Sequence, residues 1–288
     1  MIKSINNINS VITLSPAGKE RGQRIIVFSP HPDDDVIAMG GTIYHLVQQG
    51  QVVHVAYQTS GNIAVSDEDV QRFLVAHQGD DELKKKFGCE ISDVPLLAIK
   101  GLVRQEEALA ACAHNQIPAS RVHFLNMPFY ETGRVEKNPI GEVDVALICR
   151  LLLSIKPHQI YMAGDFNDPH DTHRKCTEAI CKALELIRNN QQGEWLDACE
   201  IWLYNGAWDE WPIEDIDMAV PMTHAELMHK RQAIQKHQSQ MENAPYKGAD
   251  LRLFWQRSED RNMRTAKALE GLGCPHYEAV EAFVRYIW

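Results

Sequence analysis

Short apolar runs alternate with helical patterns along most of this chain of 288 residues. The runs at residues 24–29, 52–58, 122–125, 160–163 and 200–205 have the length and composition of buried strands. The order strand, helix, strand, helix is typical of an α/β protein with a largely parallel sheet and helices on both faces. Such sheets bind ligands beyond the carboxyl ends of their strands, where the strand order reverses.

The remaining elements follow from the same patterns. We expect a first helix from Val36 to about Gly50, and further helices at residues 66–87, 103–115, 142–155 and 172–190. The second half is less regular, and its expected elements are a strand at 218–220, helices at 223–238 and 258–271, and a final apolar run at 282–287.

Composition narrows the class of protein. With 44% hydrophobic and 24% charged residues, the chain can bury a large core within one domain, which we place at residues 23–288. A net charge of −10 argues against a nucleic-acid surface, and no apolar stretch approaches the roughly 18 residues of a membrane span. Residues 1–22 form a polar lead without the apolar block of a secretory signal.

The cysteines indicate a reducing compartment. Seven cysteines show no CxxC pair, and their odd number speaks against a disulfide framework. We therefore expect buried free thiols and a cytoplasmic protein.

An acidic turn, His31-Pro32-Asp33-Asp34-Asp35, follows the first expected strand and opens the first expected helix. Three carboxylates in one turn repel each other unless a positive group neutralises them. A divalent metal is the simplest such group, and imidazole with carboxylate suits zinc or a similar transition metal better than calcium. The turn therefore predicts one half of a metal-dependent hydrolytic site.

The segment 164–173 predicts the other half, because it also follows an expected strand and opens a helix. Its His170 and His173 are three residues apart and would project to the same side of one helical turn. Asp171, between them, is expected to support the site. Asp35 is expected to cap the first helix or to orient His31.

These two motifs resemble those of a known family. Ser29-Pro30-His31-Pro32-Asp33-Asp34 together with His170-x-x-His173 is similar to the PIG-L/LmbE family of zinc-dependent N-deacetylases. The resemblance extends from about residue 24 to about 240, and it implies a Rossmann-like fold. It also implies removal of acetyl groups from N-acetylglucosamine-type sugars.

The resemblance also implies individual roles. His31, Asp34 and His173 match the ligands of one zinc ion, or of another divalent transition metal. Asp33 matches the general base, and His170 matches the histidine that stabilises the oxyanion or protonates the leaving amine. Either Asp33 or His170 could supply that last proton.

Three further residues are expected to bind substrate. Arg104-x-x-Glu107 resembles the family's Arg-x-x-Glu helix start, where the arginine reaches the substrate. His237-Gln238-Ser239-Gln240 resembles a late His-x-Ser-Gln element that lines the pocket. Tyr130 lies in a loop after a strand, from which it could reach the same pocket.

The sequence departs from the family pattern at two positions. Asp35 stands where glutamate is usual, and Asp168 stands where one branch has tyrosine, which leaves open which group assists the oxyanion. Trp202, Trp208 and Trp211 could stack on sugar rings, although packing in the core or at an interface is the favoured interpretation.

A narrower resemblance concerns the segments 56–65, 128–133 and 236–240. They are similar to the deacetylase-like half of two-part proteins whose front half resembles a glucosamine-6-phosphate deaminase. This chain carries no such front half, so deaminase activity is not expected even where relatives are named for it.

The sequence therefore predicts a zinc-dependent hydrolase that cleaves the amide C–N bond of an N-acetylated amino sugar or sugar conjugate. The expected partner is this small molecule, with no nucleic acid and no membrane span, and the sequence does not fix whether a homo-oligomer forms. Two alternatives stay open at this point: a catalytically silent sugar-binding or regulatory module, and an amidase that cleaves another C–N bond.

Overall fold

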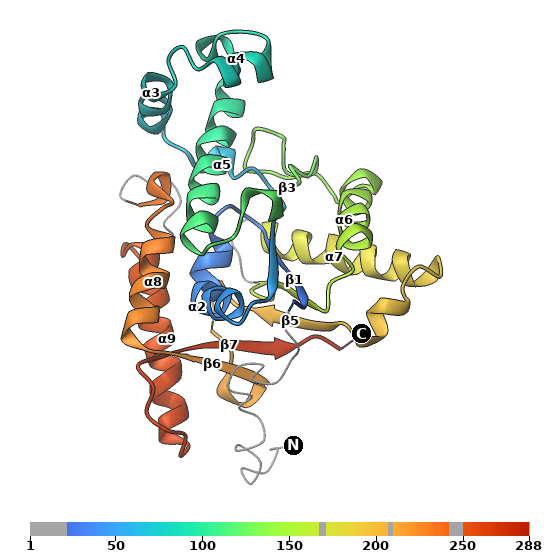
Figure 1. Cartoon of the computed structure of the whole chain (residues 1–288), viewed down its shortest axis with the longest axis vertical. Coiled ribbons are helices and arrows are strands. Elements are labelled where there is room, and N and C mark those ends of the chain that lie inside the picture. The colour runs from blue at the N-terminus through green and yellow to red at the C-terminus, as the bar shows by residue number, and fades with distance from the viewer. Residues whose placement is uncertain (1–21, 167–170, 207–209, 242–249, 288) are drawn as a thin grey trace.

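A seven-stranded sheet in the order β3-β2-β1-β4-β5-β7-β6 forms the centre of the molecule (Figure 1). The structure is a computed structural model, and it describes residues 22–166, 171–206, 210–241 and 250–287. The strands are β1 (Arg24–Ser29), β2 (Val52–Tyr57), β3 (Val122–Phe124), β4 (Gln159–Ala163), β5 (Glu200–Tyr204), β6 (Met218–Met222) and β7 (Ala279–Arg285). The first five strands are parallel, and β7 runs antiparallel to both β5 and β6. The predicted α/β class with a largely parallel sheet is confirmed.

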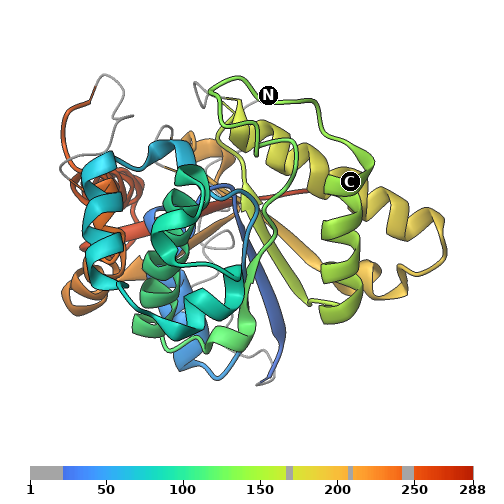
Figure 2. The ribbon, with the colours of Figure 1, turned by 90° about the horizontal axis from the view of Figure 1, so that it is seen from above.

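Helices cover both faces of this sheet (Figure 2). The helices are α2 (Asp34–Gln48), α3 (Asp67–Ala76), α4 (Asp81–Phe87), α5 (Leu96–His114), α6 (Glu142–Ile155), α7 (Thr172–Asn189), α8 (His224–Ile234) and α9 (Phe254–Gly271). In β1, Ile26 and Phe28 pack with α6 and α7, whereas Ile25 and Val27 pack with α2 and α5. Successive side chains of a strand point to opposite faces, so one apolar run serves both layers.

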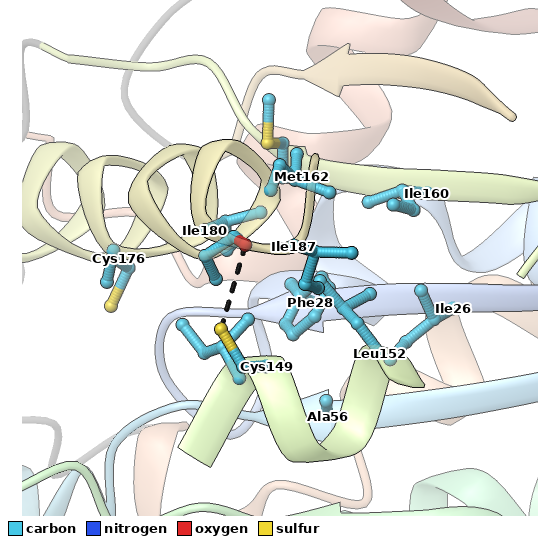
Figure 3. Packing of buried hydrophobic residues seen from close by; sticks show 14 of the residues in the cluster. Ile26, Phe28, Ala56, Cys149, Leu152, Ile160, Met162, Cys176, Ile180 and Ile187 are labelled. Carbon is cyan, nitrogen blue, oxygen red and sulfur yellow. Dashed lines mark hydrogen bonds between the residues drawn. The ribbon is translucent and has the colours of Figure 1, made fainter. Parts of the chain in front are cut away.

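Figure 3 shows part of the first of these cores, between β1, α6 and α7. The Cys149 thiol of α6 donates to the carbonyl oxygen of Ala183 in α7, 3.6 Å away. All seven cysteines are free, as the sequence predicts, and four of them are buried.

Four predicted helices differ from the structure in their bounds: the one at 223–238 ends earlier in the structure, as α8, the one at 258–271 begins earlier, since α9 starts at Phe254, and the other two differ more. The stretch expected as one helix, 66–87, forms α3 and α4, because Gly79 takes φ +77° and the Asp80 carboxylate caps a new helix. Helix α5 begins at Leu96, directly after Pro95, and not near residue 103. Leu96 and Leu97 are exposed, so the apolar period that marks a helix starts later than the helix itself.

Helix α2 is broken one turn after it begins. Met39 has φ −141° and ψ 29°, so the hydrogen-bond ladder of the helix is interrupted there. The freed N–H groups of Gly41 and Thr42 donate to the carboxylate of Glu281 in β7, at 3.0 and 2.7 Å. Glu281 therefore caps the second part of α2 from a strand that lies 240 residues later in the sequence.

The same carboxylate belongs to a buried ion pair. Lys230 of α8 donates to Glu281 at 2.7 Å and to Asn262 of α9 at 2.7 Å, and neither Lys230 nor Glu281 is exposed. On the other side of the break, the carbonyl oxygen of Ile37 accepts from Ser258 and from Arg261 of α9. The carboxyl-terminal elements thus fix the start of α2.

Within the described ranges, no helix has both the length and the apolar character that a membrane crossing requires. The expected polar lead lies almost wholly outside those ranges, so the boundary at residue 23 stays a prediction.

Candidate active site

The two predicted halves of the site meet at the point where the strand order reverses. Strand β1 pairs with β2 on one side and with β4 on the other. The turn that carries His31 follows β1, and the segment that carries Asp165 follows β4. Both therefore lie beyond the carboxyl ends of adjacent parallel strands, where open α/β sheets bind ligands.

His31, Asp34 and His173 converge there. Oδ2 of Asp34 lies 3.1 Å from Nδ1 of His31 and 3.2 Å from Nε2 of His173. One ligand atom from each residue lies within 4.8 Å of the others, close enough for a single metal ion. Burial alone would raise the pKa of Asp34, but His173 and His31 hold it well below its usual range. A carboxylate that stays ionised between two imidazoles suits a divalent cation.

Asp165 orients His173, a role that the sequence did not predict. Its Oδ1 lies 2.7 Å from Nδ1 of His173, and its Oδ2 accepts from the N–H of Gly206 at 3.0 Å. A Cβ on Gly206 would lie only 2.6 Å from this carboxylate, so only glycine fits. The bond to Nδ1 leaves Nε2 of His173 facing Asp34. The only sequence signal for this role is that Asp165 lies two residues after the end of β4.

Asp33 lies beside this group but outside it. Its side chain is buried and pairs with Arg104 at 3.1 Å. Its backbone has φ 151° and ψ −24°, a conformation that side chains disfavour and that is common at active sites. Burial raises the pKa of Asp33 to about 6, although Arg104 acts in the opposite direction. The residue can therefore change protonation state near neutral pH.

Arg104 reaches the site from the middle of α5, not from a helix start as the resemblance implied. It is 1% exposed, and it also donates to the carbonyl oxygen of Pro32. Gly61 permits this approach: it has φ +62°, and a Cβ there would lie 3.1 Å from Pro32 and 3.4 Å from Cζ of Arg104. Nε of Arg104 has no hydrogen-bond partner within the described residues.

His237 is fully buried, and neither of its ring nitrogens has a partner in the part of the chain that the structure describes. Burial and the charge of Arg104 lower the pKa of His237 to about 3, so the ring is neutral. Glu107 of α5 holds the following segment by accepting from the N–H and the hydroxyl of Ser239, at 2.6 and 2.7 Å. Burial raises the pKa of Glu107 to about 7.

Tyr130 packs against the predicted metal ligand His31. It is 2% exposed, and its ring meets the His31 ring edge-on with a centroid separation of 5.7 Å. The structure therefore brings Arg104, His237 and Tyr130 to the same strand ends as the candidate metal group, while their substrate contacts stay a prediction.

The remaining residues named from the sequence lie outside the described ranges or away from the candidate metal group. His170, Asp168 and Trp208 lie outside the described residues. Asp171 has φ +58° and directly precedes α7, in which His173 is the second residue. Asp171 pairs with Arg174 at 2.5 Å on the surface.

Asp35 does not orient His31 directly, which corrects the expectation for it. It accepts from the hydroxyl of Tyr57 at 3.1 Å, and its N–H donates to Ser29 at 3.1 Å. Ser29 in turn donates to the carbonyl oxygen of His31. Trp202 is buried in the core, in agreement with the packing interpretation.

A comparison with models of protein families shows to which family the chain belongs. The family model of PIG-L, described as GlcNAc-PI de-N-acetylase, matches residues 26–184, more than half of the chain. The chain belongs to the PIG-L family. The match contains His31, Asp34 and His173 as well as the acidic turn.

A curated relative of this PIG-L protein is a glucosamine-6-phosphate deaminase-like protein of Bacteroides thetaiotaomicron. The two are 50% identical over 99% of this chain and 48% of the relative. The chain thus spans about half the length of the relative, in line with the expected resemblance to one half of a two-part protein.

Solved structures share the fold. The N,N'-diacetylchitobiose deacetylase of Pyrococcus horikoshii matches with a TM-score of 0.65 and 17% identity, over 97% of this chain and 89% of its own. GalB, a 4-carboxy-2-hydroxymuconate hydratase of Pseudomonas putida, matches with a TM-score of 0.62 and 16% identity, over 92% of this chain and 97% of its own. The zinc-inhibited form of the teicoplanin deacetylase Orf2 matches with a TM-score of 0.53 and 17% identity, over 91% of this chain and 98% of its own. At such identities these likenesses establish the fold, and the match to the PIG-L family supports an N-deacetylase-type hydrolase.

Proposed function

We propose that this PIG-L protein is a zinc-dependent N-deacetylase that acts on an N-acetylated amino sugar or sugar conjugate. The observation that carries the proposal is the convergence of His31, Asp34 and His173 within 4.8 Å, with the strained Asp33 beside them and outside the group. An acid next to the ligands is what a hydrolytic site needs as its base.

The donor set fits zinc. Two imidazoles and one carboxylate are a common three-residue set for catalytic zinc, which keeps a further position for water or substrate. The bond from Asp165 to Nδ1 of His173 is the outer support that such ligands usually have. When bound, the metal would polarise the acetyl carbonyl and lower the pKa of a water molecule.

Asp33 then acts as the general base. A carboxylate oxygen of Asp33 accepts the proton of the attacking water, and the ion pair with Arg104 fixes the direction in which the carboxylate points. The departing nitrogen needs a proton, which Asp33 or His170 supplies. Donation to the oxyanion is the other role proposed for His170. Removal of one such donor lowers the rate of comparable enzymes by a factor on the order of 10²–10³.

Three residues would contact the sugar. Arg104 has an unpartnered Nε, and His237 has two unpartnered ring nitrogens, among the described residues. Buried polar groups without partners are costly, so hydroxyl or amide groups of a substrate would stabilise them. Tyr130 would contact the sugar from the side of His31.

The test is a panel assay on purified, zinc-loaded protein. N-acetylglucosamine, its 6-phosphate, N,N'-diacetylchitobiose and acetylated thiol conjugates are each scored for acetate, free amine and ammonia. We expect equal amounts of acetate and amine from at least one compound, and much less from the Asp33→Asn variant. Ammonia without acetate would indicate a deaminase and refute the proposal.

The two alternatives give other results. Zinc bound at one ion per chain with no product from the whole panel would favour the silent sugar-binding module. Amine released without acetate, from the second amide bond of a thiol conjugate, would favour another C–N amidase.

A further inference from the structure

The loop between β3 and α6 carries a buried lysine near the candidate site. Lys137 is 8% exposed, and its Nζ lies 3.6 Å from the ring centroid of Tyr130. The same tyrosine ring meets His31 edge-on, so one aromatic side chain separates the ammonium group from the predicted metal ligand. Lys137 therefore lies beside Tyr130, one of the residues expected to contact substrate.

Among the residues that the structure describes, no carboxylate forms an ion pair with this ammonium group. Its nitrogen donates to the carbonyl oxygens of Tyr130 and Arg134, at 3.4 and 2.7 Å, and the described residues place no Asp or Glu oxygen within 4.0 Å of it. Lys230, which is also buried, shows the contrast: it pairs with Glu281 at 2.7 Å. Burial of a cation without a counter-charge is costly, so an anionic ligand would be stabilised at Lys137.

Glu131, the acid whose charge acts most on Lys137, is already engaged by other groups. Glu131 accepts from the N–H and the hydroxyl of Ser60, at 3.2 and 3.1 Å, and from the side-chain amide of Asn62 at 3.1 Å. It holds the segment after β2 against this loop and does not pair with Lys137.

A second cation lies beside the first. Nζ of Lys175, in α7, donates to the carbonyl oxygen of Lys137 at 3.3 Å. Burial lowers the pKa of Lys137 to about 8, with Glu131 opposing and Lys175 adding to the effect, so its side chain is still mainly charged at pH 7. Lys175 also pairs with Asp171 at 3.9 Å, so of these two ammonium groups it is Lys137 that has no acid oxygen within 4.0 Å among the described residues.

We propose that Lys137, assisted by Lys175, binds an anionic group of the substrate, so that the enzyme prefers an acetylated sugar that carries a phosphate or a carboxylate to the neutral sugar. The inference rests on the proposed deacetylase function and specifies its substrate class. Lys137 would act on specificity and not on the chemical step.

The test compares kcat/KM for neutral and anionic substrates on zinc-loaded protein. N-acetylglucosamine is the neutral compound, N-acetylglucosamine 6-phosphate and 1-phosphate are the phosphate compounds, and N-acetylmuramic acid carries a carboxylate. We expect at least one anionic compound to exceed the neutral one by about tenfold or more, which corresponds to one hydrogen bond to a charged group. Lys137→Met should reduce that ratio toward one, and Lys137→Arg should retain most of it.

A matched control and a binding measurement keep the outcomes separate. Lys182→Met, at a surface pair with Glu178, should leave the ratio unchanged. Amine released equally well from neutral and anionic sugars, or equal losses for both in Lys137→Met, would overturn the inference while the deacetylase proposal stands.

If no compound is hydrolysed, the deacetylase proposal fails, and calorimetric titration then decides the inference. Tighter binding of glucosamine 6-phosphate than of glucosamine, reduced in Lys137→Met, would support it. Equal binding would overturn it.

Discussion

Asp165 and His173 are joined by a hydrogen bond of 2.7 Å, and this bond selects the imidazole nitrogen that faces Asp34. Burial alone would lower the pKa of His173, but Asp165 and Asp34 raise it well above its usual range. A metal at this position would replace the proton that the two carboxylates now favour. Asp165 thus controls the site without being among the predicted ligands.

We therefore expect Asp165→Ala to weaken metal binding by about 10–100-fold, the usual cost of removing the outer support of a histidine ligand. Asp165→Asn should lose less, because the amide oxygen can still accept from Nδ1. Competition titration with a zinc chelator measures the change. Unaltered affinity in the alanine variant would show that the orientation of His173 does not depend on Asp165.

His173→Ala should abolish stoichiometric zinc, because two protein ligands remain. Elemental analysis after dialysis gives the metal content per chain. His224→Ala, at an exposed histidine that contacts Glu278, is the matched control and should retain the metal. One zinc per chain in His173→Ala would refute the ligand assignment.

Asp33→Asn should keep zinc and lose turnover by about 10²–10⁴, the usual contribution of a general base. Asparagine has nearly the same size and shape as aspartate, so the turn should keep its backbone conformation at this position. The assay is amine release from the best substrate of the panel, with metal content measured in parallel. Asp197→Asn, at a side chain 82% exposed, should behave as the wild type. Full turnover in Asp33→Asn would remove the residue from its proposed role.

Lys230→Met should destabilise the fold strongly, because it leaves the Glu281 carboxylate buried and unpaired. Breaking such a pair typically costs about 3–5 kcal/mol in the free energy of unfolding. Urea denaturation monitored by circular dichroism measures it. Lys182→Met removes an exposed pair and should change stability far less. Equal effects of the two substitutions would mean that the buried pair contributes little.

Glu107 should make stability depend on pH. Burial raises its pKa in the folded protein from 4.5 to about 7, with Arg104 opposing, so folding favours the protonated form. This contribution is complete below pH 4.5 and is lost as the pH rises through about 7. Melting temperatures of wild type and Glu107→Gln across pH 4.5–8 should therefore diverge, with the variant gaining relative to the wild type at high pH. Parallel curves would contradict this.

The sequence predicted the parts of this molecule that depend on local patterns. Short apolar runs predicted where the strands lie. The acidic turn after β1 predicted the position of the candidate site, because several carboxylates at one strand end have few structural uses. His237 was found only through the family resemblance, since a lone histidine on a helix-like segment carries no signal of its own.

Contacts between distant segments could not be predicted in this way. Asp165 became important only once Gly206 and His173 lay beside it. The start of α5 was missed because its first turn exposes leucines. Nothing in the sequence marks Lys137 as a binding residue. Only the folded structure shows that no acid oxygen of the described residues lies within 4.0 Å of its ammonium group.

The break in α2 has a consequence for how the protein matures. Asp33 and Asp34 lie one turn before Met39, and the groups that satisfy this break belong to Glu281, Ser258 and Arg261. A nascent chain that has not yet released residues 254–285 from the ribosome can pair its first five strands but lacks the partners for this bend. The acidic turn should therefore reach its working shape, and its full affinity for zinc, only after residues 254–285 have been synthesised and have folded against α2.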